Sequence, residues 1–161
     1  MTTTEISTDR IEKQIVVRAP RAKVWRAITD SKEFGKWFRA ELSDPFVPGA
    51  SARGRITHPG YEHLTFEVWV ERIEPEHYFS FRWHPYAVDP QKDYSQEPTT
   101  LVEFRLDETP EGTRIQVSES GFDQIPVERR AEAFRMNSGG WEAQMQNVAR
   151  YVDENNVDAT A

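Results

Sequence analysis

The last third of the chain most constrains its fold, because residues from about Pro126 to Glu154 have the pattern of one long helix. Such a helix spans roughly 40 Å at about 1.5 Å per residue, and isolated helices are only marginally stable in water. It must therefore lie across a wide surface that buries its apolar side. One stripe with spacings of three and four marks that side: Phe134, Ser138, Trp141, Met145, Val148 and Val152.

The chain before this helix predicts an antiparallel sheet. Phe79, Phe81 and Trp83 alternate with polar residues, which is typical of a strand with one buried and one solvated face. The same alternation predicts strands at about 11–17, 64–71, 102–106 and 115–119, with a weaker one at 50–57. Between the first two strands, Ala19-Pro20 opens one short helix and Asp30-Ser31 caps a second.

These elements predict an α+β fold in which a curved antiparallel sheet of about six strands wraps around the long C-terminal helix, with the two short helices between the first two strands. The 161 residues suit a single domain, 1–161, with an ordered core at about 10–154 and short flexible tails. A pocket between helix and sheet is the expected place for function.

Composition excludes several partner classes. The net charge of −7 repels phosphate backbones and anionic lipid headgroups, so we expect neither a nucleic-acid nor a membrane partner. The absence of cysteine removes disulfides and thiolate chemistry. With no apolar stretch long enough to span a membrane, the expected location is cytoplasmic.

Four stretches carry a resemblance to a known superfamily. They are Ala19-Pro20 with Val24-Trp25 and Thr29-Asp30; Trp37-Phe38 before Pro48-Gly49; Thr100-Leu101-Val102-Glu103-Phe104; and Glu119-Ser120-Gly121-Phe122 with Gly140-Trp141. In this order the sequence resembles the START-like (SRPBCC) helix-grip superfamily, and the branch similar to the C-terminal domain of the activator of the ninety-kilodalton heat-shock protein ATPase. The resemblance covers about residues 10–153.

The resemblance implies a cavity between the long helix and the sheet, which different members use for lipids, hormones, polyketides or natural products. Eukaryotic activators also carry a separate N-terminal domain, whereas this chain has about ten residues before its first predicted strand. We therefore expect, first, a protein that binds an apolar or aromatic small molecule without transforming it. The alternatives are a chaperone-associated protein-interaction module and a cyclase-like or hydrolase-like enzyme that uses the same cavity.

The residues expected to border the cavity are mostly aromatic, although most of these rings also serve as core. They are Trp37, Phe38, Phe66, Phe81, Trp83, Glu119, Phe134, Ser138 and Trp141. Glu119 is in phase with the apolar residues of its strand, which leaves two interpretations. It is either a pocket group with a raised pKa or, the preferred interpretation, a group at the end of the strand that is solvated or bonds the backbone amides around Ser120-Gly121-Phe122. Glu103 has the opposite phase and is expected on the solvated face, paired with Arg105 or a neighbouring residue.

The adjacent Gly139 and Gly140 interrupt the helical pattern, and together they cost about 2 kcal/mol relative to alanine. Either they open room for a ligand, or they permit a bend or close packing. The loop at 85–98 is interpreted as an ordinary strand connection, with a lid over the cavity as the alternative.

No strong signal for catalysis or a cofactor is present. The four histidines, at positions 58, 63, 77 and 84, lack metal-ligand spacing, and no nucleophile elbow, phosphate loop or dinucleotide fingerprint occurs. Glu119, His84, Tyr61 and Tyr78 are the acid-base candidates that an enzyme would need. We expect no catalytic residues, no metal and no cofactor.

Overall fold

The computed structural model describes residues 9–89 and 91–159, and its elements follow the predicted order. They are β1 (Arg10–Val17), α1 (Arg21–Thr29), α2 (Ser31–Phe38), β2 (Ala40–Leu42), β3 (Ser51–Ile56), β4 (Thr65–Glu74), β5 (Tyr78–Trp83), β6 (Thr100–Thr109), β7 (Gly112–Ser120), a 3-10 turn η1 (Phe122–Gln124) and α3 (Val127–Ala159). Residues 1–8, which are most of the expected N-terminal tail, lie outside the described residues, as do residue 90 and the last two residues of the chain.

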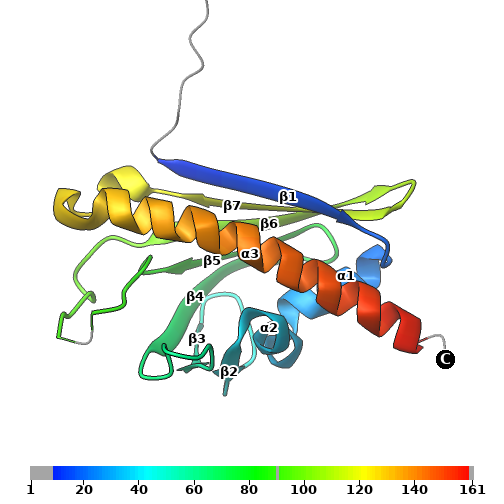
Figure 1. The fold of residues 1–161 in the computed structure, drawn as a ribbon, viewed down its shortest axis with the longest axis horizontal. Helices are drawn as coiled ribbons and strands as arrows, with labels where there is room; N and C mark the ends of the chain where they lie inside the picture. The colour runs from blue at the N-terminus through cyan, green and yellow to red at the C-terminus, as the bar shows by residue number, and fades with distance from the viewer. Residues whose placement is uncertain (1–8, 90, 160–161) are drawn as a thin grey trace, which may run out of the picture.

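A seven-stranded antiparallel sheet forms the body of the fold, in the order β1-β7-β6-β5-β4-β3-β2. It is curved, and α3 crosses its concave face while α1 and α2 pack beside the helix (Figure 1). This confirms the predicted α+β helix-grip architecture. The strand that the sequence did not reveal is β2, whose three residues pair with β3 through Ala40 opposite Ile56.

The core lies between the inner face of the sheet and the three helices. Phe79, Phe81, Phe104, Ile115 and Val117 are fully buried on the inner face of their strands, as the alternation predicts. The helix meets them with one stripe, whose buried members are Ala133, Trp141, Met145, Val148 and Val152. The outer face of the sheet is largely polar.

The short helices begin and end where local chemistry dictates. Asp30 caps α2, because its Oδ1 accepts the backbone N–H groups of Lys32 and Glu33 at 2.9 and 3.2 Å. Arg39 ends this helix in the left-handed conformation, with φ of 70°. Phe38, the last helical residue, is consequently held beside α3, where its carbonyl accepts a hydrogen bond from Gln144.

Helix α3 is continuous through Gly139 and Gly140, so the glycine pair does not break it. A Cβ atom built on either glycine would meet no neighbouring atom within 4 Å. Close packing of another element against these glycines is therefore wrong as an explanation of their presence.

Candidate ligand-binding site

Three neighbouring strands bring Trp83, Thr100 and Glu119 together at one end of the sheet. Trp83 on β5 lies opposite Thr100 on β6, and Glu119 on β7 lies opposite Val102. All three side chains are on the inner face, and α3 covers them with Asn137 and Trp141. These two helical residues are four positions apart, a spacing that places both on one side of a helix.

Glu119 is the centre of this arrangement and is fully buried, with 0% of its surface exposed. Its Oε2 accepts hydrogen bonds from Thr100 Oγ1 at 2.6 Å and Trp83 Nε1 at 2.8 Å. Its Oε1 accepts one from Trp141 Nε1 at 2.8 Å, and Asn137 Nδ2 lies 3.1 and 3.2 Å from the two oxygens. The carboxylate therefore joins three strands to the helix through neutral donors.

Burial raises the pKa of Glu119 above its ordinary value of 4.5, because the buried site disfavours the charged form. The hydrogen bonds from Thr100, Trp83, Trp141 and Asn137 partly offset this effect. The preferred sequence interpretation, a solvated group at the end of the strand, is wrong. The phase of Glu119 indicated its direction correctly, but the two indole donors that hold it come from distant segments.

A pocket of about 130 Å³ lies beside this network, at the seam between α2, β5 and α3. Its lining consists of three aromatic rings, two amides and a glycine: Phe38, Trp83, Trp141, Asn137, Gln144 and Gly140. Asn137, Trp83 and Trp141 each line the pocket and also bind Glu119. The side chains of these three residues thus separate the Glu119 carboxylate from the pocket.

A second hollow, of about 200 Å³, lies on the other side of Phe38 and Trp83. Phe66, Ile56 and Leu64 line it together with these two rings, and Ala87 and Val88 reach it from the connection between β5 and β6. Phe38 and Trp83 therefore form a wall shared by two adjacent spaces.

The structure gathers five of the nine residues expected at a ligand site: Phe38, Phe66, Trp83, Glu119 and Trp141. Trp37 lies elsewhere, buried with its indole donating to the Ala27 carbonyl at 2.8 Å. Phe81 is fully buried in the core, 5.4 Å from the Trp83 ring. Ser138 is half-buried and is not among the residues that line the seam pocket.

Phe134 packs against Phe122 at 5.2 Å and lines a separate surface hollow at the start of α3. Asn137, Thr100 and Gln144 were not predicted to belong to the site. The spacing of Asn137 from Trp141 was the available signal, because any residue four positions before a buried tryptophan lies on the same helical side.

The connection between β5 and β6 is anchored to the first turns of α3. Arg129 Nε donates to Glu97 Oε1 at 2.8 Å, and its Nη1 donates to the Pro85 carbonyl at 2.7 Å. The guanidinium also lies 4.7 Å from the centre of the Tyr94 ring. These contacts hold the segment beside the second hollow and fit the predicted strand connection.

On the outer face, Glu103 pairs with Arg105 at 3.2 Å, as predicted, and also accepts a hydrogen bond from Tyr78 at 2.6 Å. Burial opposes its ionisation, but the hydrogen bond from Tyr78 and the charges of Arg105 and Arg10 outweigh that effect and lower the pKa of Glu103. In the ranges 9–89 and 91–159 no group of three or more potential side-chain ligands is placed to hold a metal ion.

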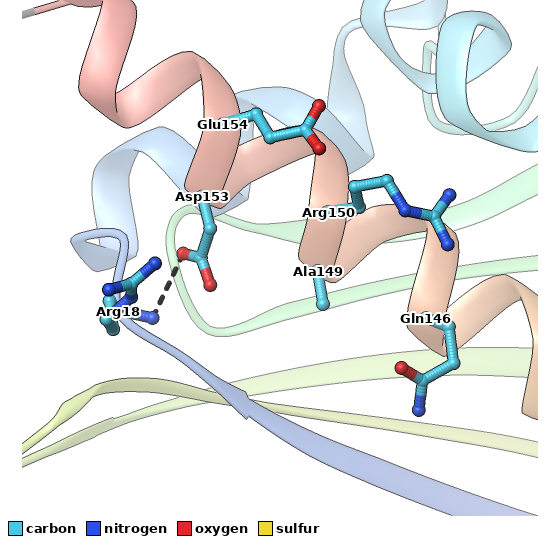
Figure 2. Close-up of a pocket in the computed structure, with 6 residues that line it drawn as sticks. All are labelled: Arg18, Gln146, Ala149, Arg150, Asp153 and Glu154. Atoms are coloured by element: carbon cyan, nitrogen blue, oxygen red, sulfur yellow. Dashed lines mark hydrogen bonds between the residues drawn. The ribbon is translucent and has the colours of Figure 1, made fainter.

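A larger hollow of about 370 Å³ lies at the other end of α3, but its lining is mainly charged or polar. Figure 2 shows Asp153 turned toward the backbone of Arg18. Its Oδ1 accepts the N–H groups of Arg18 and Ala19 at 3.0 and 3.1 Å, so this carboxylate fastens α3 to the segment between β1 and α1. We assign it a structural role.

A long helix across the concave face of an antiparallel sheet, with a pocket at their seam, defines a START-like helix-grip protein. Residues 18–153 match the family described as Activator of Hsp90 ATPase homolog 1-like protein. The chain belongs to this family. A search of curated proteins finds no match.

Solved structures share the fold. Protein MLL2253 from Mesorhizobium loti has a TM-score of 0.70 at 23% identity, over 90% of this chain and 97% of that one. The Aha1 dimer from Colwellia psychrerythraea has a TM-score of 0.66 at 15% identity, over 89% and 96%. DynU16, a putative protein in the dynemicin biosynthetic locus, has a TM-score of 0.68 at 27% identity, over 89% of this chain and 46% of DynU16.

Proposed function

We propose that this protein binds a small apolar or aromatic molecule in the seam pocket and does not transform it. The observation that carries the proposal is the convergence of Phe38, Trp83 and Trp141, from three different elements, around one space of about 130 Å³. Aromatic walls with a few polar groups are typical of small-molecule sites. Asn137 and Gln144 supply the polar groups here.

The volume limits what the pocket accepts. An engineered cavity of about 150 Å³ holds one benzene molecule. The seam pocket is therefore suited to a single ring or a compact branched group. A larger ligand would extend across Phe38 and Trp83 into the neighbouring hollow of about 200 Å³.

The pocket chemistry favours binding over catalysis. Among the described residues that line it, none is a carboxylate, histidine or nucleophile. Glu119 lies behind the wall, and each of its oxygens is already engaged by an indole N–H. A general acid or base must reach the reacting atom directly or through one water.

A protein-interaction role is the second candidate, because the chain belongs to a family named for a chaperone activator. One observation favours it: Trp69, on the outer face of the sheet, is 37% exposed. Exposed tryptophans are common binding anchors.

We place either activity in the cytoplasm, since a chain without cysteine needs no oxidising compartment. In the part of the chain that the structure describes, no helix has the length and apolar character of a membrane span.

Thermal unfolding with a panel of small neutral aromatics and aliphatics tests the binding proposal. A ligand at about 100 times its Kd stabilises the folded state by about 2.7 kcal/mol, which raises Tm. The matched variants are Gly140→Leu, which fills the pocket, and Gly139→Leu, whose side chain projects outside the pocket lining. We expect the shift to vanish only in Gly140→Leu. An unchanged Tm with every panel member, or a shift that survives in Gly140→Leu, would refute the proposal.

A further inference from the structure

Three cationic side chains line one hollow where the end of α2 meets the second half of α3. Lys36 and Arg39 come from the last turn of α2 and its C-cap, and Arg150 comes from α3. This basic hollow has a volume of about 190 Å³ and shares no lining residue with the seam pocket. Among the described residues that line it, the one carboxylate is that of Glu154. Positive charge therefore dominates locally in a chain whose net charge is −7.

None of the three cations has an acidic partner within the ranges 9–89 and 91–159. The ion pairs found there all involve other arginines and lysines. Figure 2 shows Arg150 extending away from Asp153. Lys36 and Arg39 are three positions apart at the end of one helix, a spacing at which like charges repel each other. An anion in the basic hollow relieves this repulsion.

The backbone of Arg39 is an independent observation that points to the same hollow. Its φ of 70° lies in the left-handed region, which is unfavourable for a residue with a Cβ atom. Glycine ends many helices in this conformation, so an arginine here accepts strain that a glycine avoids. The hydrogen bonds found for Arg39 in the described ranges are those of its backbone, with Gly35 and Thr57. Ending α2 therefore does not explain the arginine side chain.

Arg150 is oriented by its neighbours on α3. Its Nη1 donates to Asn147 Oδ1 at 3.3 Å, and Asn147 Nδ2 donates to Gln144 Oε1 at 3.1 Å. A guanidinium has five N–H donors, and its planar fork matches the oxygens of a phosphate group. Two such forks from different elements, with the Lys36 ammonium beside them, suit a multiply charged oxyanion.

We propose that the basic hollow binds the phosphate group of a small, soluble phosphate monoester. A monoester carries about 1.5 to 2 negative charges at pH 7 and three strong acceptor oxygens, which suits three cations. Nucleic acids and anionic membranes extend beyond the hollow, where the net charge of −7 repels them. A compact ligand avoids that repulsion, because charges farther than about 8 Å are largely screened at physiological salt. This site is separate from the seam pocket and does not depend on the binding function proposed for it.

Methyl phosphate and dimethyl phosphate test the proposal, because only the monoester becomes a dianion above its second pKa of about 6. Titrations at about pH 8 would follow the backbone amide resonances of Arg39 and Arg150. We expect methyl phosphate to bind about tenfold more tightly than dimethyl phosphate. Arg39→Gly and Arg150→Gln should each weaken it by about tenfold. Arg135→Gln, which removes an equal charge from an exposed position nearer the start of α3, should leave the affinity unchanged.

The stability of Arg39→Gly tests the argument from backbone strain. Glycine fits the left-handed conformation, so the urea midpoint should stay the same or rise while phosphate binding is lost. A lower midpoint would give the arginine side chain a structural role and contradict the argument.

Three results would overturn the phosphate assignment. They are equal binding of the two esters, equal weakening in Arg39→Gly and Arg135→Gln, and unchanged amide resonances of Arg39 and Arg150 on addition of methyl phosphate. A response to DNA or to phosphatidylserine vesicles without one to methyl phosphate would also overturn it. Gly140→Leu, which fills the seam pocket, should retain the phosphate response, so the two proposals fail independently.

Discussion

Replacing Gly139 and Gly140 by alanine tests whether the pocket requires the two glycines although they lower the stability of the helix. Both residues lie within α3, and a Cβ atom on either meets nothing within 4 Å. The change therefore adds helix propensity without a clash. Glycine is about 0.8–1.0 kcal/mol less favourable than alanine inside a helix, so each substitution should stabilise the fold by about 1 kcal/mol.

Urea unfolding followed by tryptophan fluorescence measures this gain. The midpoint should rise with an unchanged m-value, and thermal unfolding should show an increase of about 2–4 °C for each variant. Because residues at adjacent helical positions do not face each other, the double variant should gain about 2 kcal/mol. Ligand affinity distinguishes the two positions, since only Gly140 lines the pocket.

Gly112→Ala is the control with the opposite expected sign. Gly112 has a φ of +152°, and its Cβ atom would lie 2.1 Å from the Val17 carbonyl oxygen. The same chemical change should therefore destabilise the protein by more than 1 kcal/mol. If Gly139→Ala or Gly140→Ala also destabilises the fold, the open space beside α3 is not present in solution. The reasoning on the pocket would then fail as well.

Three further predictions concern single carboxylates and one phenol. Because burial raises the pKa of Glu119, its carboxyl group contributes fully to stability below about pH 4.5, and this contribution is lost as the pH rises through the folded pKa. Free energies of urea unfolding measured against pH should show this decline, and Glu119→Gln should remove it. An unchanged profile in Glu119→Gln would contradict the prediction. Burial and the hydrogen bond to Glu33 raise the pKa of Tyr151 to about 12, so an ultraviolet titration should lose its latest-titrating phenol in Tyr151→Phe. Asp153→Ala should lower the unfolding free energy by about 1–2 kcal/mol, and Asp153→Asn, which keeps an acceptor, by less; equal losses would refute the role of the two backbone hydrogen bonds.

The fold was predictable wherever a pattern repeats within one segment. The alternation of Phe79, Phe81 and Trp83 placed β5 and its buried face, and Asp30 marked the start of α2. Strand β2 was not predictable, because three residues carry no periodicity and the strand exists through its pairing with β3. Element types come from local chemistry, whereas short edge strands depend on the partner that the fold supplies.

The region of the candidate site was predictable from the sequence, but the helical residues that line the pocket were not. Ser138 was expected at the pocket, whereas its neighbour Asn137 lines it. One position along an α-helix is a rotation of about 100°, so a stripe drawn through Phe134 and Trp141 can include the wrong residue between them. The glycine pair had two sequence interpretations, and the empty surroundings of both Cβ positions remove only the close packing of another element.

Glu119 shows why the chemistry of the site needed the three-dimensional structure. Strand phase gives the direction of a side chain, but the state of a carboxylate depends on what surrounds it. Trp83 and Trp141 lie 36 and 22 residues away in the sequence, and their indoles reach opposite oxygens of the same group. The same two rings line the pocket, so any guest that displaces either ring disturbs the hydrogen bonds of a fully buried carboxylate. A guest that moves either ring would therefore weaken the attachment of α3 to the sheet at Glu119.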